Sequence, residues 1–121
     1  MREYNVQFYE KENGEVPAEA FLLSLDKKMR AKLTGLIVIL QEYGNQLREP
    51  YSKPLGDGIF ELREKVGSDI SRVLYFFYHN GVIILTNGFM KKSRKTPKDE
   101  IHKAKRYRKD YLERCERDEK I

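Results

Sequence analysis

The fold is decided by residues 59–95, which read IFELREKVGSDISRVLYFFYHNGVIILTNGFMKKSRK. Two runs rich in Val, Ile, Leu, Phe and Tyr flank Asn80-Gly81 in this stretch. Asn-Gly is the dipeptide that best tolerates the positive φ angles of a two-residue type I′ hairpin. A second turn is predicted at Gly67-Ser68. The stretch therefore predicts three consecutive antiparallel strands followed by a run of positive charge.

The turn at Asn80-Gly81 also predicts the register of its hairpin. The expected pairs are His79 with Val82, Phe77 with Ile84, Tyr75 with Thr86, and Arg72 with Phe89. A turn at Gly67-Ser68 places Arg63 opposite Arg72. Because side chains alternate between the faces of a strand, one face of the sheet is predicted to be apolar and to pack against helices. Its residues are Phe60, Leu62, Val73, Tyr75, Phe77, Val82, Ile84 and Thr86.

The opposite face collects positive charge at one end. It carries Ile59, Glu61, Arg63, Lys65, Ile70, Arg72, Leu74, Phe76, Tyr78, Ile83, Leu85, Asn87, Phe89 and Lys91. Like charges on neighbouring strands destabilise a sheet, so four cations together indicate a site for an anion such as phosphate. The alternative is that Glu61, Glu64 and Asp69 neutralise the cluster, which is then only a solvated patch.

The segments before residue 59 predict a strand and two helices. Glu3 to Glu10 alternates Tyr4, Val6 and Phe8 with polar residues, as a half-buried strand does. Pro17 suits the first turn of a helix whose apolar face would be Ala20, Phe21, Leu23 and Leu25. Asp26 caps a longer helix to about Tyr43, with Met29, Leu33, Leu36, Leu40 and Tyr43 at helical spacing, and Gly44-Asn45 ends it. Residues 48–58 are predicted to form a surface loop.

A third helix is predicted after the last strand. Thr96 would cap it, Pro97 would occupy its first position and Asp99 would complete a capping box. Its apolar stripe is expected to contain Ile101, Ala104, Tyr107 or Arg108, Tyr111, Leu112 and Cys115. The whole chain is thus predicted to be one α+β domain, residues 1–121, in the order β-α-α-β-β-β-α. The sheet would be mainly antiparallel and twisted, with two helices on one face and a C-terminal helix.

Composition narrows the classes of function. The sequence contains no apolar run near the length of a membrane span, and its first residues lack a secretory signal, so we expect a cytoplasmic protein without membrane contact. One cysteine and two distant histidines supply neither a disulfide nor a metal site, and no cofactor is expected. Residues 91–114 hold eleven Lys or Arg and four Asp or Glu. This asymmetry indicates a polyanion or an acidic protein as partner.

The chain resembles the RelE superfamily of toxins, in particular the HigB and phage-derived branch of type II toxin-antitoxin systems. The resemblance rests on the LREK strand, on the arginine that begins RVLYFF, and on the passage from Phe89 to Ile101 with its KK and KTP groups. It implies a ribosome-dependent mRNA endonuclease that cleaves mRNA in the A site. It also implies a cognate antitoxin with a helix-turn-helix domain, similar to HigA, through which operator DNA would be reached only indirectly.

The resemblance assigns catalytic positions to Arg63, Lys65, Arg72, Lys91 and Lys92, with Lys95 close to them. For some members it implies a tyrosine or histidine in the site, for which Tyr107, Tyr111 and His102 are weaker matches.

The chemistry of the residues agrees with this class of reaction. A cation cluster can stabilise the pentavalent phosphate of RNA cleavage, with Arg72 holding the phosphate and Lys65 or Lys91 acting as general base. Phe89 would stack on a base, while Lys95, Lys103 and Lys105 would bind RNA phosphates. Two alternatives remain: a basic module that binds RNA or ribosomes without cutting, and an interaction domain whose basic helix binds an acidic protein.

Overall fold

The computed structural model describes residues 4–91 and 95–119. Its elements are β1 (Asn5–Phe8), α1 (Pro17–Ser24), α2 (Lys27–Tyr43), the 3-10 turn η1 (Gly44–Gln46), β2 (Ser52–Gly56), β3 (Ile59–Val66), β4 (Asp69–Tyr78), the 3-10 turn η2 (His79–Gly81), β5 (Val82–Met90) and α3 (Lys98–Glu119). The five strands form one sheet in the order β1-β5-β4-β3-β2. Only β1 with β5 is a parallel pair. The fold is therefore α+β with a mainly antiparallel sheet, as predicted.

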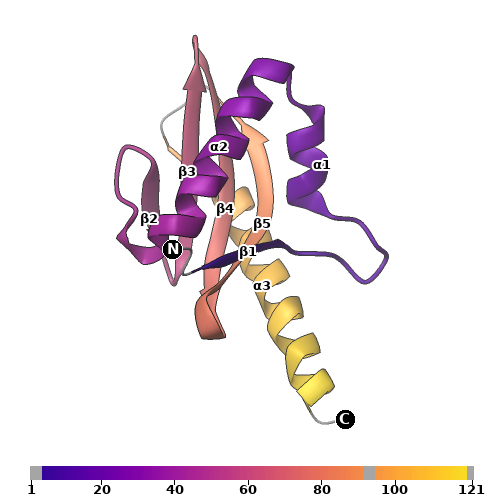
Figure 1. Cartoon of the computed structure of the whole chain (residues 1–121). Helices are drawn as coiled ribbons and strands as arrows, with labels where there is room; N and C mark the ends of the chain where they lie inside the picture. Colours follow the sequence, from indigo (N-terminus) through magenta and orange to yellow (C-terminus); the bar gives the residue numbers. More distant parts are fainter. Residues whose placement is uncertain (1–3, 92–94, 120–121) are drawn as a thin grey trace.

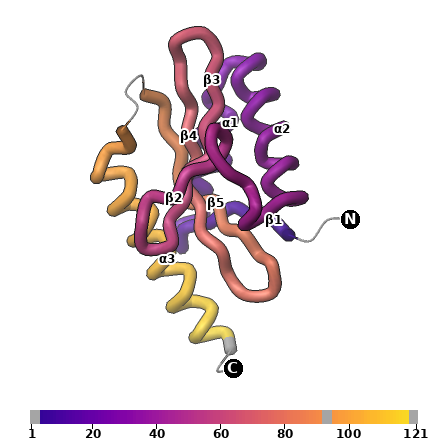
Figure 2. Tube along the Cα trace, turned by 90° about the vertical axis from the view of Figure 1, so that its left-hand side faces the viewer, coloured from indigo at the N-terminus to yellow at the C-terminus, as the bar shows by residue number. Residues whose placement is uncertain are grey.

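The sheet lies between two layers of helix. Helices α1 and α2 cover one face, α1 mainly over β5 and α2 over β3, while α3 crosses the other face (Figure 1). The turned view in Figure 2 places α2 and α3 on opposite sides of the strands. Each face has its own apolar cluster, one including Leu33, Leu62 and Tyr75, the other including Ile59, Phe76 and Ala104. The face that carries the predicted cation cluster is thus covered along much of its length by α3.

Strand β2 corrects the prediction of a loop over residues 48–58. Its residues Ser52 to Gly56 pair with β3, and the shift between Pro54 and Gly56 marks an irregularity in the ladder. Proline is tolerated at this position because β2 is the edge of the sheet, where a missing N–H breaks no inner ladder. The order is therefore β-α-α-β-β-β-β-α, one strand more than the sequence predicted.

The two N-terminal helices end and pack for identifiable reasons. The side chain of Asp26 accepts a hydrogen bond from the Met29 N–H at 2.9 Å, which caps α2 as expected. Gly44 ends α2 at φ +51°, and a Cβ there would lie 2.0 Å from the Tyr4 ring. Two details of the predicted apolar faces are wrong. In α1 the buried positions are Ala18 and Leu22, whereas Leu23 is 64% exposed, and in α2 Tyr43 is 52% exposed.

The predicted register holds at only one end of the β4–β5 hairpin. The turn is a three-residue 3-10 turn, with Asn80 at φ +60°, so Tyr78 rather than His79 pairs with Val82. A bulge in the ladder between Leu74 and Tyr75 then restores the predicted pairing of Arg72 with Phe89. Between the turn and the bulge, every side chain of β5 therefore lies on the face of the sheet opposite to the one predicted. Ile83 and Leu85 therefore lie in the α1–α2 cluster, and Val82 and Ile84 lie against α3.

Helix α3 is fixed to the sheet by its apolar side and by polar contacts near β2. Ala104 is fully buried, and the stripe continues through Tyr107 rather than Arg108. Leu112 is 41% exposed, so the predicted stripe ends earlier than expected. Lys105 Nζ lies 2.6 Å from the Asp57 carboxylate in the turn between β2 and β3. None of the helices in the described part of the chain is long and apolar enough to cross a membrane.

Candidate functional site

The Glu61 carboxylate lies between two of the predicted catalytic arginines. Its Oε1 is 3.2 Å from Nε of Arg63 and 3.3 Å from Nε of Arg72, while the Thr96 hydroxyl donates a hydrogen bond to its Oε2. Glu61 and Arg72 are fully buried, and the Arg63 side chain is 22% exposed. Glu61 therefore neutralises part of the cation cluster, so the alternative of a neutralised cluster is confirmed for Arg63 and Arg72. Glu64 is engaged elsewhere, 3.7 Å from Lys32 of α2.

Arg72 joins the central strands to the segment that leads into α3. Its guanidinium lies 5.8 Å from the centre of the Phe89 ring, and its Nη1 donates to the Lys95 carbonyl at 3.3 Å. Burial lowers the pKa of Arg72, an effect that the neighbouring Glu61 charge opposes. In this conformation the side chain has no exposed surface with which to contact a phosphate. Its geometry is that of a residue that positions others, and a catalytic role for it stays a prediction.

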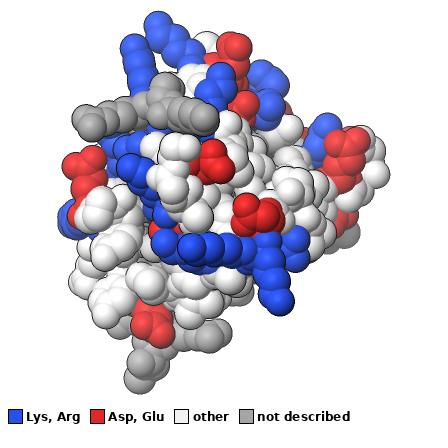
Figure 3. Space-filling model, turned by 90° about the horizontal axis from the view of Figure 1, so that it is seen from above, with Lys and Arg blue, Asp and Glu red and all other residues white. Residues whose placement is uncertain are grey.

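The two exposed lysines of the predicted cluster, Lys65 and Lys91, lie at the end of the α3-covered face of the sheet, beyond the helix itself. Lys65 pairs with Ile70 across β3 and β4, and the Lys91 N–H donates to the Ile70 carbonyl at 3.1 Å. Lys65 and Lys91 are therefore on either side of Ile70, and both are exposed. Seen from above, lysine and arginine side chains lie in several groups on a largely uncharged surface, with carboxylates between them (Figure 3). The structure thus brings Arg63, Lys65 and Lys91 to one end of the sheet.

A groove of about 520 Å³ adjoins these cations at the β2 edge. Its lining residues are Glu49, Pro50, Tyr51, Arg63, Glu64, Lys65 and Ile70. Tyr51 is 51% exposed, and its carbonyl accepts the Arg63 N–H at 3.0 Å, which holds the two residues side by side. An exposed aromatic ring beside two cations suits a nucleotide, because the base can stack while its phosphate meets the charges.

Tyr51, which the sequence places in the predicted loop of residues 48–58, is a further candidate for the site. In the sequence, Tyr51 is marked only by its position in REPYSKP, shortly before the ELR strand. This position indicates a site residue only once β2 is known to pair with β3, because that pairing brings Tyr51 beside Arg63.

The remaining predicted site residues are scattered or already paired. Phe89 is 8% exposed beneath Arg72, so Tyr51 offers the more accessible ring. Lys103 lies 3.7 Å from Glu100, and Lys105 is paired with Asp57 away from the groove. Lys92 lies outside the described residues. The roles of all these residues in RNA binding or catalysis stay predictions.

The weaker candidates for a catalytic tyrosine or histidine all lie on α3, the two tyrosines in the core and the histidine on the surface. Tyr107 stacks on Tyr9 and Tyr111 packs edge-on against Phe76, so both serve the core between α3 and the sheet. His102 is exposed on the helix. In residues 4–91 and 95–119, no three His, Cys, Asp or Glu side chains gather as a metal site.

Comparison with known proteins places the chain in a family. No curated protein matches the sequence significantly. A family model, however, matches residues 20–109, a segment that runs from α1 through the strands and into α3. The match includes Glu61, Arg63, Arg72 and the groove at the β2 edge. The chain belongs to the phage-derived Gp49-like protein family (DUF891).

Proposed function

We propose that this protein is the toxin of a toxin-antitoxin system and that it cleaves mRNA in the ribosomal A site, as RelE and HigB toxins do. The Gp49-like family supports the first part, because it is a family of phage-derived proteins consistent with toxins and their antitoxin partners. The observation that carries the second part is the groove in which Tyr51 lies beside Arg63 and Lys65, with Lys91 close by.

The groove offers groups that assist RNA cleavage. The 2′-oxygen attacks the adjacent phosphorus after giving up its proton, the bond to the 5′-oxygen breaks, and that oxygen takes up a proton from water. The products are a 2′,3′-cyclic phosphate, or the 3′-phosphate derived from it, and a 5′-hydroxyl. Arg63 and Lys65 would stabilise the added negative charge on the phosphate as preorganised electrostatics. Lys65 or Lys91 would take the proton from the 2′-hydroxyl, and Tyr51 would hold the base.

Arg63 owes its orientation to the buried pair beneath it. Its Nε is held by Glu61, which is fixed in turn by Arg72 and Thr96. An arginine that is already oriented loses little conformational freedom when it binds phosphate, so more of the interaction stabilises the transition state. In this proposal Glu61 and Arg72 are positioning residues, and Arg63 contacts the substrate.

Growth arrest on expression of the chain tests the proposal. Arg63→Ala and Lys65→Ala should each relieve the arrest, since loss of one group that stabilises transition-state charge typically lowers a rate by about 100-fold to 1000-fold. Lys109→Ala is the matched control, because Lys109 is an exposed lysine on α3. It lies one turn beyond the contact of Lys105 with Asp57, which is at the end of β3 opposite to Arg63 and Lys65. Both variants should keep the circular dichroism spectrum of the parent. Folded variants at Arg63 and Lys65 that stay fully toxic would remove the proposed site.

The antitoxin should bind the chain directly and suppress its toxicity. We propose a protein similar to HigA, with a helix-turn-helix domain that would link the toxin to operator DNA. A chain that arrests translation and binds ribosomes but leaves mRNA intact would instead be the non-catalytic RNA-binding module considered above.

A further inference from the structure

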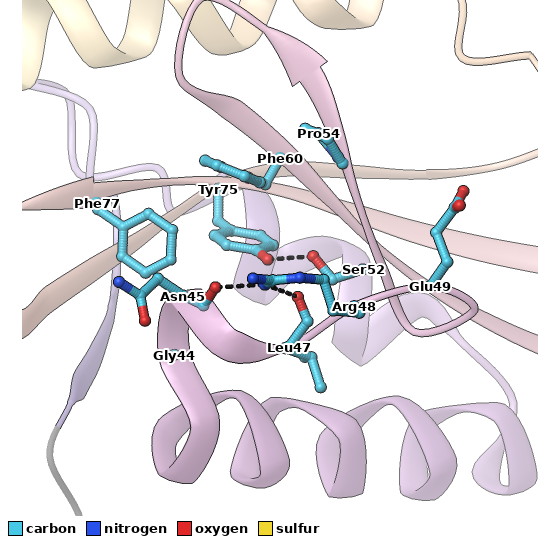
Figure 4. Close-up of a pocket in the computed structure, with 10 residues that line it drawn as sticks. All are labelled: Gly44, Asn45, Leu47, Arg48, Glu49, Ser52, Pro54, Phe60, Tyr75 and Phe77. Atoms are coloured by element: carbon cyan, nitrogen blue, oxygen red, sulfur yellow. Dashed lines mark hydrogen bonds between the residues drawn. The ribbon is translucent and has the colours of Figure 1, made fainter.

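A second hollow lies on the opposite face of the sheet, beyond the C-terminal end of α2. Its volume is about 490 Å³, and its floor is formed by Phe60, Tyr75 and Phe77 (Figure 4). The turn η1 and strand β2 form its walls. The hollow exists because α2 ends at Tyr43 while the strands beneath it continue, which leaves part of the aromatic surface without a helix above it.

The pocket combines an apolar floor with one oriented cation at its rim. The hydroxyls of Ser52 and Tyr75 are hydrogen-bonded to each other and so leave the floor mainly apolar. Arg48 is exposed, and its Nη1 donates to the carbonyls of Asn45 at 2.6 Å and Leu47 at 3.3 Å. The other guanidinium N–H groups of Arg48 have no partner in the described ranges, and they are donors suited to a carboxylate.

A third hollow of about 370 Å³ continues this surface around the outside of α2. Its lining residues are Ile39, Tyr43, Gln46, Leu47, Arg48, Glu49 and Tyr51. Three of the large side chains that line it are well exposed, with Ile39 at 40%, Tyr43 at 52% and Tyr51 at 51%. Exposed apolar side chains gathered beside a pocket are typical of protein-binding surfaces.

We propose that these two hollows bind an acidic segment of the antitoxin, an inference that rests on the proposed function. An apolar or aromatic side chain of that segment fills the pocket over Phe60 and Phe77, and a neighbouring carboxylate pairs with Arg48. The chemistry favours a protein over RNA here, because the surface is largely apolar and offers one oriented cation instead of a cluster.

The position of this surface gives the antitoxin a means of inhibition. Residues 47–51 form a loop that separates the antitoxin surface from the RNA groove: Glu49 lines all three hollows, and Tyr51 lines both the outer hollow and the groove. A partner that contacts Tyr51 from the outer side would cover the ring that the base needs. The antitoxin therefore blocks RNA without touching Arg63 or Lys65.

Binding to the protein encoded next to this chain, measured by calorimetry, tests the inference. Arg48→Glu should weaken that binding at least about tenfold, as expected when one member of an interfacial charge pair is reversed. Tyr43→Ser should weaken it as well, without altering the loop that Arg48 holds. Lys28→Glu is the control, since it reverses a charge at the other end of α2. Tyr43→Ser should arrest growth as the parent does and should need more antitoxin for rescue.

The outcomes separate this inference from the proposed function. If the unaltered chain binds that protein and both Arg48→Glu and Tyr43→Ser leave the affinity unchanged, the antitoxin lies elsewhere and the inference is wrong. If the unaltered chain does not bind it, the toxin-antitoxin proposal fails and this inference fails with it. If ultracentrifugation shows a dimer of the free chain that Tyr43→Ser dissociates, the surface belongs to a second copy and the inference is overturned.

Discussion

Replacing Arg72 with methionine should destabilise the fold strongly, although the residue carries a charge. The change keeps much of the side-chain volume but leaves the Glu61 carboxylate fully buried without its Arg72 partner. Removing one member of a buried ion pair costs about 3–5 kcal/mol. Arg63 and Thr96 still contact Glu61, so we expect the lower end, about 3 kcal/mol. With a urea m-value of about 1–3 kcal/mol per molar, the midpoint of unfolding should fall by roughly 1–3 M.

Urea unfolding followed by circular dichroism measures this effect, and a double-mutant cycle isolates its cause. Glu61→Gln in the Arg72→Met background should recover part of the loss, because it removes the uncompensated charge. Arg63→Met is the control. Its side chain is 22% exposed, so solvent screens its pairing with Glu61 and the cost should be about 1 kcal/mol or less. An Arg72→Met midpoint within experimental error of the parent would refute the argument that this pair supports the sheet.

Two further predictions concern packing and pH. Gly88→Ala should lower the free energy of unfolding by about 1–3 kcal/mol, because a Cβ there would lie 2.2 Å from the Phe21 ring. Gly35→Ala should raise it by about 0.5–1 kcal/mol, because open space surrounds that helical position. Thermal unfolding of the two variants and the parent measures both effects. Burial and the hydrogen bond to Asp110 raise the pKa of Tyr9 to about 12. A raised pKa means that the folded state retains the proton longer, so stability is lost as pH rises from the unfolded value of 10.0 through about 12. Tyr9→Phe should reduce that alkaline loss without abolishing it, because burial also raises the pKa of Tyr111 to about 12 and raises the pKa of Tyr75. An unchanged pH profile would show that Tyr9 does not contribute to the loss.

Much of the fold could be predicted from local patterns. The cap at Asp26, the spacing of Met29 to Leu40 and the Asn80-Gly81 turn each depend on residues close in the chain, and α2 and the β4–β5 hairpin follow from them. The register near the turn could not be predicted, because a three-residue turn and a bulge change it twice. Strand β2 was missed since Pro54 and its flanking glycines resemble a loop, and only edge pairing with β3 shows otherwise.

The candidate site was predictable as a set of strand positions but not as a charge distribution. Alternation places Arg63, Lys65 and Arg72 on one face, which the structure confirms. Alternation also places Glu61 on this face, and the alternative that it neutralises the cluster is confirmed for Arg63 and Arg72. Alternation does not show that α3 covers that face, nor that Thr96 reaches Glu61, because these contacts join residues far apart in the sequence. Tyr51 lies in the loop before β2, as predicted, but its position beside Arg63 depends on the pairing of β2 with β3.

Mapping of new 5′ ends on translating ribosomes tests the central claim most directly. Primer extension on an mRNA translated with the purified chain should show cuts within the codon in the A site, each leaving a 5′-hydroxyl. Lys65→Ala and Arg63→Ala should abolish these cuts, while Lys109→Ala should leave them unchanged. Translation that stops without new 5′ ends, or cuts that persist in folded Arg63→Ala and Lys65→Ala variants, would contradict the proposal that this groove cleaves mRNA.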